Sequence, residues 1–293
     1  MVRILQFGTT GQLAREMLAR AGEGAAVQAL SRGDVDLADA AAVEAAVMAA
    51  DADLVLNAAA YTAVDQAETE QPLAFAVNAE APGAMARACA ARGLPLVHIS
   101  TDYVFDGDKA GAWTEADRTG PINAYGRSKL AGERAVLESG ASALILRASW
   151  VFSPYGRNFV KTMLALADRP ELRVVDDQRG RPTAAGDLAD FILAAAPRLA
   201  GRDPALFGVF HFAGEGATSW RGFAEAIFEA AGGPRPKVVP ITTADYPTPA
   251  RRPRNSELDC GKLERVHGVR PRPWSAGLAE ALAALNTSSE VPA

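Results

Sequence analysis

Short apolar stretches alternate with longer amphipathic stretches along the first half of the chain. Short apolar runs bounded by turn signals are typical of buried strands, and here they cover 4–7, 27–30, 53–56, 95–100 and 143–147. The stretches between them predict helices over 12–20, 39–50, 72–92 and 123–139. This alternation predicts an α/β fold, a doubly wound parallel sheet with helices on both faces.

The alternation becomes less regular after Trp150. A helical pattern over 186–199 and an apolar run over 209–212 are expected to rejoin the first sheet. We therefore expect a Rossmann domain made of residues 1–150 and rejoined by about 186–215. Residues 151–185 and 216–293 are expected to form a smaller α/β lobe that binds the substrate, and 286–293 are expected to be a disordered tail.

Composition and charge argue against several classes of protein. The chain is 49% hydrophobic and 22% charged, which is typical of a soluble globular protein. A net charge of −5 with scattered basic residues argues against nucleic acid as a partner, and no apolar run reaches the roughly 20 residues that span a membrane. Cys89 and Cys260 form no pair motif, and the first strand begins close to Met1. We expect no signal peptide and a cytoplasmic location.

A turn with two glycines follows the first predicted strand. Gly8-Thr9-Thr10-Gly11 lies directly before the helix that begins at Gln12, and Ala14 stands where a third glycine is common. Glycines at such a turn let the backbone approach a pyrophosphate, which the helix N-terminus attracts. A plain tight connection between a strand and a helix is the alternative.

The end of the second predicted strand bears on the choice of cofactor. An NAD-preferring site usually places a carboxylate there, whereas Leu30 is followed by Ser31 and Arg32. A hydroxyl and a guanidinium suit a 2′-phosphate, so we expect NADPH, with NADH also possible. The alternative is that Arg32 is an exposed residue of an arginine-rich chain. Asp36 and Leu37 are candidates for contact with the adenine, unless Asp36 only caps the next helix.

Tyr125 and Lys129 are four residues apart on a predicted helix and therefore share a face. The chain has only five tyrosines and five lysines, and no other tyrosine has a lysine at this spacing. An ammonium near a phenol is expected to lower the pKa of the tyrosine and make it a usable proton donor or acceptor. Thr101 follows the strand over 95–100, at the sheet edge where parallel sheets bind ligands. A solvated helix pair and a strand-end cap are the alternatives.

The glycine turn, Thr101 and the Tyr125/Lys129 pair, in this order, resemble the extended short-chain dehydrogenase/reductase superfamily. Further stretches resemble one branch of it, the dTDP-4-dehydrorhamnose reductase family. They lie at 57–68, 100–107, 123–133, 147–152, 158–163, 177–183 and 252–256. The resemblance covers nearly the whole chain and implies reduction of the 4-keto group of dTDP-4-dehydro-β-L-rhamnose to dTDP-L-rhamnose.

The resemblance also implies a role for individual residues. Tyr125 would protonate the 4-oxygen as hydride arrives from the nicotinamide, Lys129 would tune Tyr125 and bind the ribose, and Thr101 would hydrogen-bond the reacting oxygen. The cofactor would contact Gly8, Thr10, Gly11, Gln12, Leu13, Ser31, Arg32, Asp36, Leu37, Ala58, Ala60, Thr62, Tyr125 and Lys129. The nucleotide-sugar substrate would contact Thr101, Asp102, Trp150, Asn158, Arg181, Arg252 and Asn255. Trp150 could instead be a core residue, and the arginines near Arg252 a solvated basic loop.

Three alternatives stay open. Some members of the family dimerise around Mg²⁺ held by carboxylates, but the last helix offers only Glu280, so we predict no metal site and leave monomer and homodimer open. A nucleotide-sugar dehydratase or epimerase is a second possibility, although dehydratases usually carry an acid pair after the strand-end threonine and Asp102 is followed by Tyr103. A non-catalytic subunit like the regulatory subunit of methionine adenosyltransferase is the third, and an intact Thr101, Tyr125 and Lys129 set weighs against it.

Overall fold

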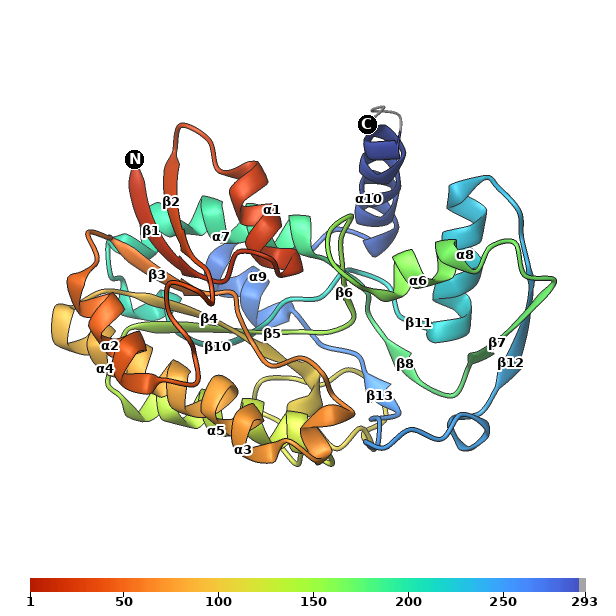
Figure 1. The fold of residues 1–293 in the computed structure, drawn as a ribbon, viewed down its shortest axis with the longest axis horizontal. Helices are drawn as coiled ribbons and strands as arrows, with labels where there is room; N and C mark the ends of the chain where they lie inside the picture. The colour runs from red at the N-terminus through yellow and green to blue at the C-terminus, as the bar shows by residue number, and fades with distance from the viewer. Residues whose placement is uncertain (290–293) are drawn as a thin grey trace.

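The computed structural model describes residues 1–289 and is organised around a six-stranded sheet (Figure 1). Its strands are β1 (Val2–Phe7), β2 (Ala25–Leu30), β3 (Leu54–Asn57), β4 (Leu96–Thr101), β5 (Ala143–Ala148) and β10 (Gly208–His211). Their order is β10-β5-β4-β3-β1-β2, and every neighbouring pair is parallel. The predicted doubly wound parallel sheet is confirmed. The strand order reverses between β1 and β3, which is where such sheets bind their ligands.

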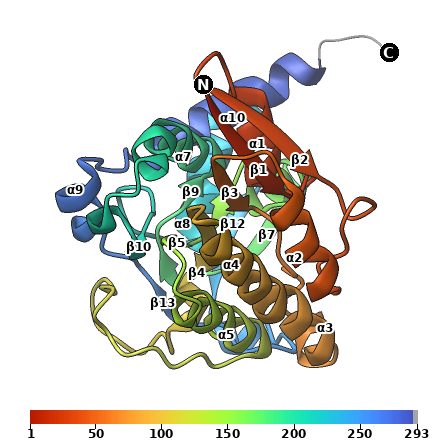
Figure 2. The same cartoon turned by 90° about the vertical axis from the view of Figure 1, so that its left-hand side faces the viewer.

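Helices cover both faces of this sheet (Figures 1 and 2). One face carries α1 (Gln12–Arg20) and α7 (Ala185–Ala200), and the other carries α2 (Ala40–Ala49), α4 (Ala81–Arg92) and α5 (Ala124–Glu138). Successive residues of β1 serve opposite faces, because Ile4 packs in the cluster with Met17 while Leu5 packs in the cluster with Val43. Burial on both faces explains why the strands read as continuous apolar runs.

The helix predicted over 72–92 is continuous but contains a π turn. It runs through α3 (Gln71–Phe75), the π-helical segment η2 (Ala76–Glu80) and α4. Asn78 in this turn donates to the Tyr61 carbonyl at 3.0 Å and to Ser128 Oγ at 2.9 Å. A Cβ on Gly132 would lie 2.0 Å from the Asn78 carbonyl oxygen, so only glycine lets α5 pack this closely. The turn therefore joins α5 to the loop that follows β3.

Nine further elements form what we call the smaller lobe, to the right in Figure 1. They are β6 (Val151–Phe152), α6 (Phe159–Ala165), β7 (Glu171–Val175), β8 (Arg179–Gly180), β9 (Thr183–Ala184), β11 (Thr218–Ser219), α8 (Trp220–Ala231), β12 (Lys237–Ile241) and β13 (Asn255–Ser256). A separate apolar cluster that includes Phe152, Val160 and Phe223 holds this lobe together. The division of the chain into domains stays a prediction.

The C-terminal end contains α9 (Gly261–His267) and α10 (Trp274–Ser289). The expectation of a disordered tail from residue 286 is wrong for 286–289, which continue α10, and 290–293 lie outside the described residues. Leu278 and Leu282 anchor this helix in the core of the smaller lobe, and Thr287 Oγ1 donates to the Ala283 carbonyl at 2.9 Å. Packing thus overrides the weak helix propensity of the polar residues at this end. In the part of the chain described, no helix has the length and apolarity needed to cross a membrane.

Candidate active site

A cavity of about 820 Å³ opens at the carboxyl ends of β1, β3, β4 and β5. A second cavity of about 480 Å³ lies at the end of β2. Both are lined by Gly8, Thr10, Ala59 and Ala60, so they adjoin over the glycine turn. Together they form a groove that crosses the strand ends at the reversal of the strand order, with volumes typical of ligand sites.

The glycine turn has the geometry expected of a phosphate-binding turn. Gly8 has a φ of +102°, a backbone conformation that other residues rarely adopt, and a Cβ there would lie 3.1 Å from the Ala59 Cβ. Gly11 is the N-cap of α1 and makes no side-chain cap hydrogen bond, so the first N–H groups of the helix remain open to an anion. Gln12 also lines the larger cavity, whereas the Leu13 side chain is buried in the core and offers only its backbone.

The smaller cavity is lined by Ser31, Arg32, Asp36 and Leu37, the residues predicted to contact the adenosine end of the cofactor. Arg32 is 80% exposed and pairs with Asp36 at 3.5 Å. Asp36 does not cap α2, because Asp39 accepts from the Ala41 and Ala42 amides at 3.0 Å and fills that role.

Asp34, at this end of the groove, was not predicted from the sequence. Its carboxylate accepts from the Ser31 amide at 2.8 Å and from Ser31 Oγ at 2.6 Å, and these hydrogen bonds lower its pKa. Ser31 is therefore held by an acidic neighbour, and Arg32 is the one cationic side chain among the described residues that line the smaller cavity.

Thr101, Tyr125 and Lys129 all line the larger cavity. Thr101 is the last residue of β4, and its Oγ1 donates to Asp102 Oδ1 at 3.0 Å. Asn123 caps α5 by accepting from the Gly126 amide at 2.7 Å, which fixes Tyr125 in the first turn. A Cβ on Gly126 would lie 2.2 Å from the Tyr103 carbonyl oxygen, so glycine allows α5 to press against the end of β4.

The pKa of Tyr125 moves in the opposite direction from the one expected. Burial raises it to about 12, because removal from water penalises the phenolate more than the hydrogen bond with Thr101 favours it. Lys129 shares the helix face of Tyr125 but does not lower this pKa, and its Nζ donates to the Ile99 carbonyl at 2.7 Å. The expectation of a lowered pKa was therefore wrong. Tyr125 therefore carries its proton at neutral pH, as a proton donor must.

A buried ion pair lies beneath Lys129. Arg147 Nε and Nη2 donate to the two carboxylate oxygens of Glu133 at 2.8 and 2.6 Å, and Ser100 Oγ donates to the same carboxylate at 2.5 Å. Burial lowers the pKa of Lys129 to about 8, and the charge of Glu133 opposes this shift. The pair was not predicted from the sequence, although Glu133 stands four residues after Lys129 and so shares its helix face.

Asp102 is a buried carboxyl group whose second oxygen has no partner. It is 3% exposed and lines the larger cavity beside Thr101 and Tyr103. Burial raises its pKa to about 6, while hydrogen bonds from Ser256 and Thr101 oppose that shift. The unpartnered oxygen is itself shielded from solvent.

Comparisons with known proteins agree with this geometry. Residues 2–287 match the family model described as the RmlD substrate binding domain. A dTDP-4-dehydrorhamnose reductase of Sinorhizobium fredii is 47% identical over 278 residues, which cover 93% of this chain and 94% of the relative. The chain belongs to the dTDP-4-dehydrorhamnose reductase family.

Solved structures of the same family are also similar. The reductase of Clostridium acetobutylicum has a TM-score of 0.90 at 38% identity, covering 97% of this chain and 99% of that one. The reductase of Bacillus anthracis, solved in complex with NADP, has a TM-score of 0.89 at 35% identity with the same coverage. The family resemblance stated from the motifs is confirmed over nearly the full length.

The expected substrate residues of this family member do not all lie at the larger cavity. Trp150 and Tyr103 line it, and Trp220, Gly156 and Arg157 line it as well, although no local motif marked those three. Four expected residues do not line it, namely Asn158, Arg181, Arg252 and Asn255. Their contacts with a substrate stay predictions.

The structure gives three of these four residues other partners. Asn158 caps α6 and donates to Gln12 Oε1 at 3.0 Å, so it ties the loop before α6 to the first helix. Asn255 donates to the Lys109 and Gly111 carbonyls at 2.8 and 2.7 Å. Arg252 pairs with Asp65 at 2.8 Å. The fourth, Arg181, lines a separate cavity of about 300 Å³.

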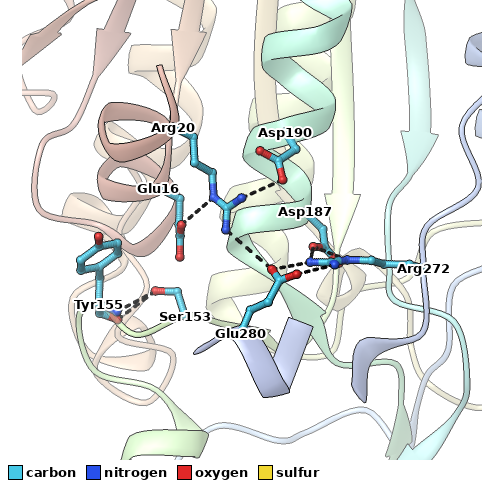
Figure 3. Close-up of polar contacts among 8 residues, drawn as sticks. All are labelled: Glu16, Arg20, Ser153, Tyr155, Asp187, Asp190, Arg272 and Glu280. Carbon is cyan, nitrogen blue, oxygen red and sulfur yellow. Dashed lines mark hydrogen bonds and ion pairs between the residues drawn. The ribbon is translucent and has the colours of Figure 1, made fainter. Parts of the chain in front are cut away.

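Glu280, the residue considered for a Mg²⁺ site, lies in a group of four carboxylates with arginines among them (Figure 3). We call this group the clamp, and it consists of Glu16, Arg20, Asp187, Asp190, Arg272 and Glu280. Arg20 contacts Glu16 at 2.9 Å and Asp190 at 2.8 Å, and Arg272 contacts Asp187 at 2.5 Å and Glu280 at 2.6 Å.

These contacts bear on whether a metal fits the clamp. Each of its four carboxylates is engaged by a guanidinium, and in the described residues no three His, Cys, Asp or Glu side chains are arranged to hold a metal ion. The clamp carboxylates are therefore paired with arginines within one chain, and the absence of a metal site stays a prediction. The clamp instead joins α1, α7 and α10 through ion pairs.

Proposed function

We propose that this chain reduces the 4-keto group of dTDP-4-dehydro-β-L-rhamnose with NADPH and gives dTDP-L-rhamnose. The observation that carries the proposal is the placement of Thr101, Tyr125 and Lys129 in one cavity that continues into the glycine-turn groove. The named activity of relatives at 41–47% identity and the NADP complex of a similar structure support the substrate and the cofactor.

The residues of the groove fit a dinucleotide. Gly8, Gly11 and the start of α1 would hold the pyrophosphate, and Ser31 and Arg32 would meet the 2′-phosphate. Lys129 would hold the nicotinamide ribose at the larger cavity. A bound reduced nicotinamide supplies the hydride that adds to C4 of the sugar.

The side chains of the larger cavity donate the proton and stabilise the charges that form. Tyr125 donates its phenolic proton to the former carbonyl oxygen as that oxygen gains negative charge, so one hydride and one proton convert the ketone to an alcohol. Thr101 hydrogen-bonds the same oxygen, and the Lys129 ammonium compensates the phenolate that remains. Solvent returns a proton to Tyr125 when product leaves.

The other readings of the sequence find less support. A dehydratase needs a second acid beside the strand-end threonine, and Tyr103, whose pKa is raised by burial, occupies the position after Asp102. A purely regulatory subunit has no need of a cavity lined by buried Thr101 and Lys129 and half-buried Tyr125. We propose a cytoplasmic enzyme that acts as a monomer or a homodimer.

The test supplies purified protein with dTDP-4-dehydro-β-L-rhamnose and NADPH and follows the absorbance of the reduced cofactor. We expect consumption that depends on the sugar, with dTDP-L-rhamnose as the product by mass spectrometry and NMR. A control reaction contains dTDP-glucose, which has no keto group. A folded protein that binds NADPH and consumes none with the keto sugar would overturn the proposal.

A further inference from the structure

Trp150 has a backbone conformation that a large side chain rarely adopts. Its φ is 48°, in the left-handed region, and Arg202 is the one other non-glycine residue with a positive φ in the described chain. Trp150 stands between β5 and β6, where the chain leaves the large sheet for the smaller lobe. Such a conformation persists only where the surroundings hold it in place.

Trp220 provides the first of these surroundings. Its ring stacks on the Trp150 ring with centroids 3.6 Å apart and planes 12° apart, and both rings line the larger cavity. Trp220 Nε1 donates to Gln178 Oε1 at 3.1 Å, and Ser219 caps α8 by accepting from the Gly222 amide at 3.0 Å. The Trp220 indole is thus fixed by its own hydrogen bond and by the start of its helix.

Gly180 provides the second. A Cβ at this position would lie 2.5 Å from Trp150 Cε2 and 2.8 Å from Cζ2, closer than real contacts allow. Gly180 has no positive φ, so its backbone does not require glycine. Glycine is required here because the Trp150 indole occupies the space that a Cβ would fill.

The register of the sheet places this indole beside the reacting groups. Thr101 of β4 pairs with Ala148 of β5, and Trp150 comes two residues after Ala148. The indole therefore forms a wall of the same cavity that Thr101 and Tyr125 line. Aromatic faces pack well on the apolar C–H face of a sugar ring, and a deoxy sugar offers more such surface than a fully hydroxylated one.

We propose that Trp220 and Gly180 are positioning residues that hold the Trp150 indole as the wall against which the sugar ring of the nucleotide sugar lies. This inference rests on the proposed function for the identity of the ligand. Neither residue needs to touch the reacting atoms, since each acts on Trp150.

The test uses Trp220→Phe and Gly180→Ala in the full chain, with Trp274→Phe as the matched control. Trp274 belongs to the same apolar cluster but does not line the larger cavity. Three quantities are measured: the exciton couplet that stacked indoles give in circular dichroism, the Kd for dTDP-L-rhamnose by calorimetry with NADP⁺ present, and the KM for NADPH. Thermal melting checks that each variant is folded.

We expect Trp220→Phe to abolish the couplet and Gly180→Ala to weaken it. Both should raise the Kd for dTDP-L-rhamnose by about three- to tenfold, with the KM for NADPH within about twofold of the parent. Trp274→Phe should leave the couplet and both constants unchanged. An unchanged Kd in folded variants that lack the couplet would overturn the proposal, as would a couplet that survives in Trp220→Phe.

These outcomes separate this inference from the proposed function. If the parent protein binds dTDP-L-rhamnose but does not turn over the keto sugar, the proposed reaction fails while the Kd values still decide the role of Trp220 and Gly180. If the parent protein binds no dTDP-L-rhamnose, both proposals fail.

Discussion

Two groups of ion pairs in this chain differ in burial, and burial decides what each can do. The Glu133–Arg147 pair beneath Lys129 has side chains 2% and 5% exposed. In the clamp, the Arg20 and Arg272 side chains are 30% and 39% exposed (Figure 3). Water screens the arginines of the clamp, although the Glu16 and Asp187 side chains are only 6% and 10% exposed, so its ion pairs contribute mainly by fastening helices together. The buried pair is screened little, and the charge of Glu133 raises the pKa of its neighbour Lys129.

The largest expected effect comes from breaking the buried pair. Glu133→Gln leaves the Arg147 guanidinium buried without a counter-charge, and it should lower the free energy of unfolding by about 3–5 kcal/mol. The same change in the clamp, Glu280→Gln, should lower it by about 1 kcal/mol or less. Urea denaturation of both variants checks this. Equal losses would contradict the contrast drawn between the two groups.

The pH dependence of turnover sharpens the role assigned to the buried pair. The pKa of Lys129 is about 8, so its ammonium is present below that pH and is lost as the pH rises through it. We expect kcat/KM to fall about tenfold per pH unit above this value, because the phenolate left on Tyr125 loses its compensating charge.

A double variant tests whether Glu133 contributes to that profile. Glu133→Gln with Arg147→Met removes both charges of the buried pair and avoids leaving either one alone. Because the charge of Glu133 raises the pKa of Lys129, the alkaline limb should move to lower pH in the double variant. If the alkaline limb of the pH profile keeps its position in a folded double variant, the buried pair has only a structural role.

Removal of Arg32 is expected to have an intermediate effect on NADPH binding, since Arg32 is a single exposed cation at the end of the glycine-turn groove. Arg32→Ala should raise the KM for NADPH by about tenfold and leave the KM for NADH nearly unchanged, because only NADPH carries the 2′-phosphate. Steady-state kinetics with both cofactors measure this. Arg15→Ala is a matched control, since Arg15 packs over Tyr155 and does not line the smaller cavity. A loss of the same size with both cofactors would remove Arg32 from the 2′-phosphate site.

The smallest effects are expected in the clamp. Arg272→Met should lower the free energy of unfolding by about 1 kcal/mol, and added salt should narrow the difference from the parent protein. Chelation of divalent cations should change neither the melting temperature nor the sedimentation coefficient, because guanidinium groups engage the clamp carboxylates. A chelator-sensitive change in either quantity would show that a metal ion takes part.

Features that depend on local sequence could be predicted, whereas features that depend on tertiary packing could not. Strong local periodicity located the strands of the large sheet and their helices, and the glycine turn and the Tyr125/Lys129 spacing located the groove. The direction of the Tyr125 pKa was missed because burial is a property of the assembled site. The clamp and the Trp150–Trp220 stack were missed because each joins residues far apart in the chain, and no local pattern reports such a meeting.

The central claim is that Tyr125 donates the proton, and Tyr125→Phe tests it most directly, with Tyr103→Phe as the control. The two rings contact each other edge to face with centroids 5.7 Å apart, so the variants lose the same hydroxyl from neighbouring positions. Single-turnover reduction of the keto sugar should slow by about 10²- to 10⁴-fold in Tyr125→Phe and far less in Tyr103→Phe, with the Kd for NADPH unchanged in both. Near-normal turnover in Tyr125→Phe, or an equal loss in both variants, would contradict the account.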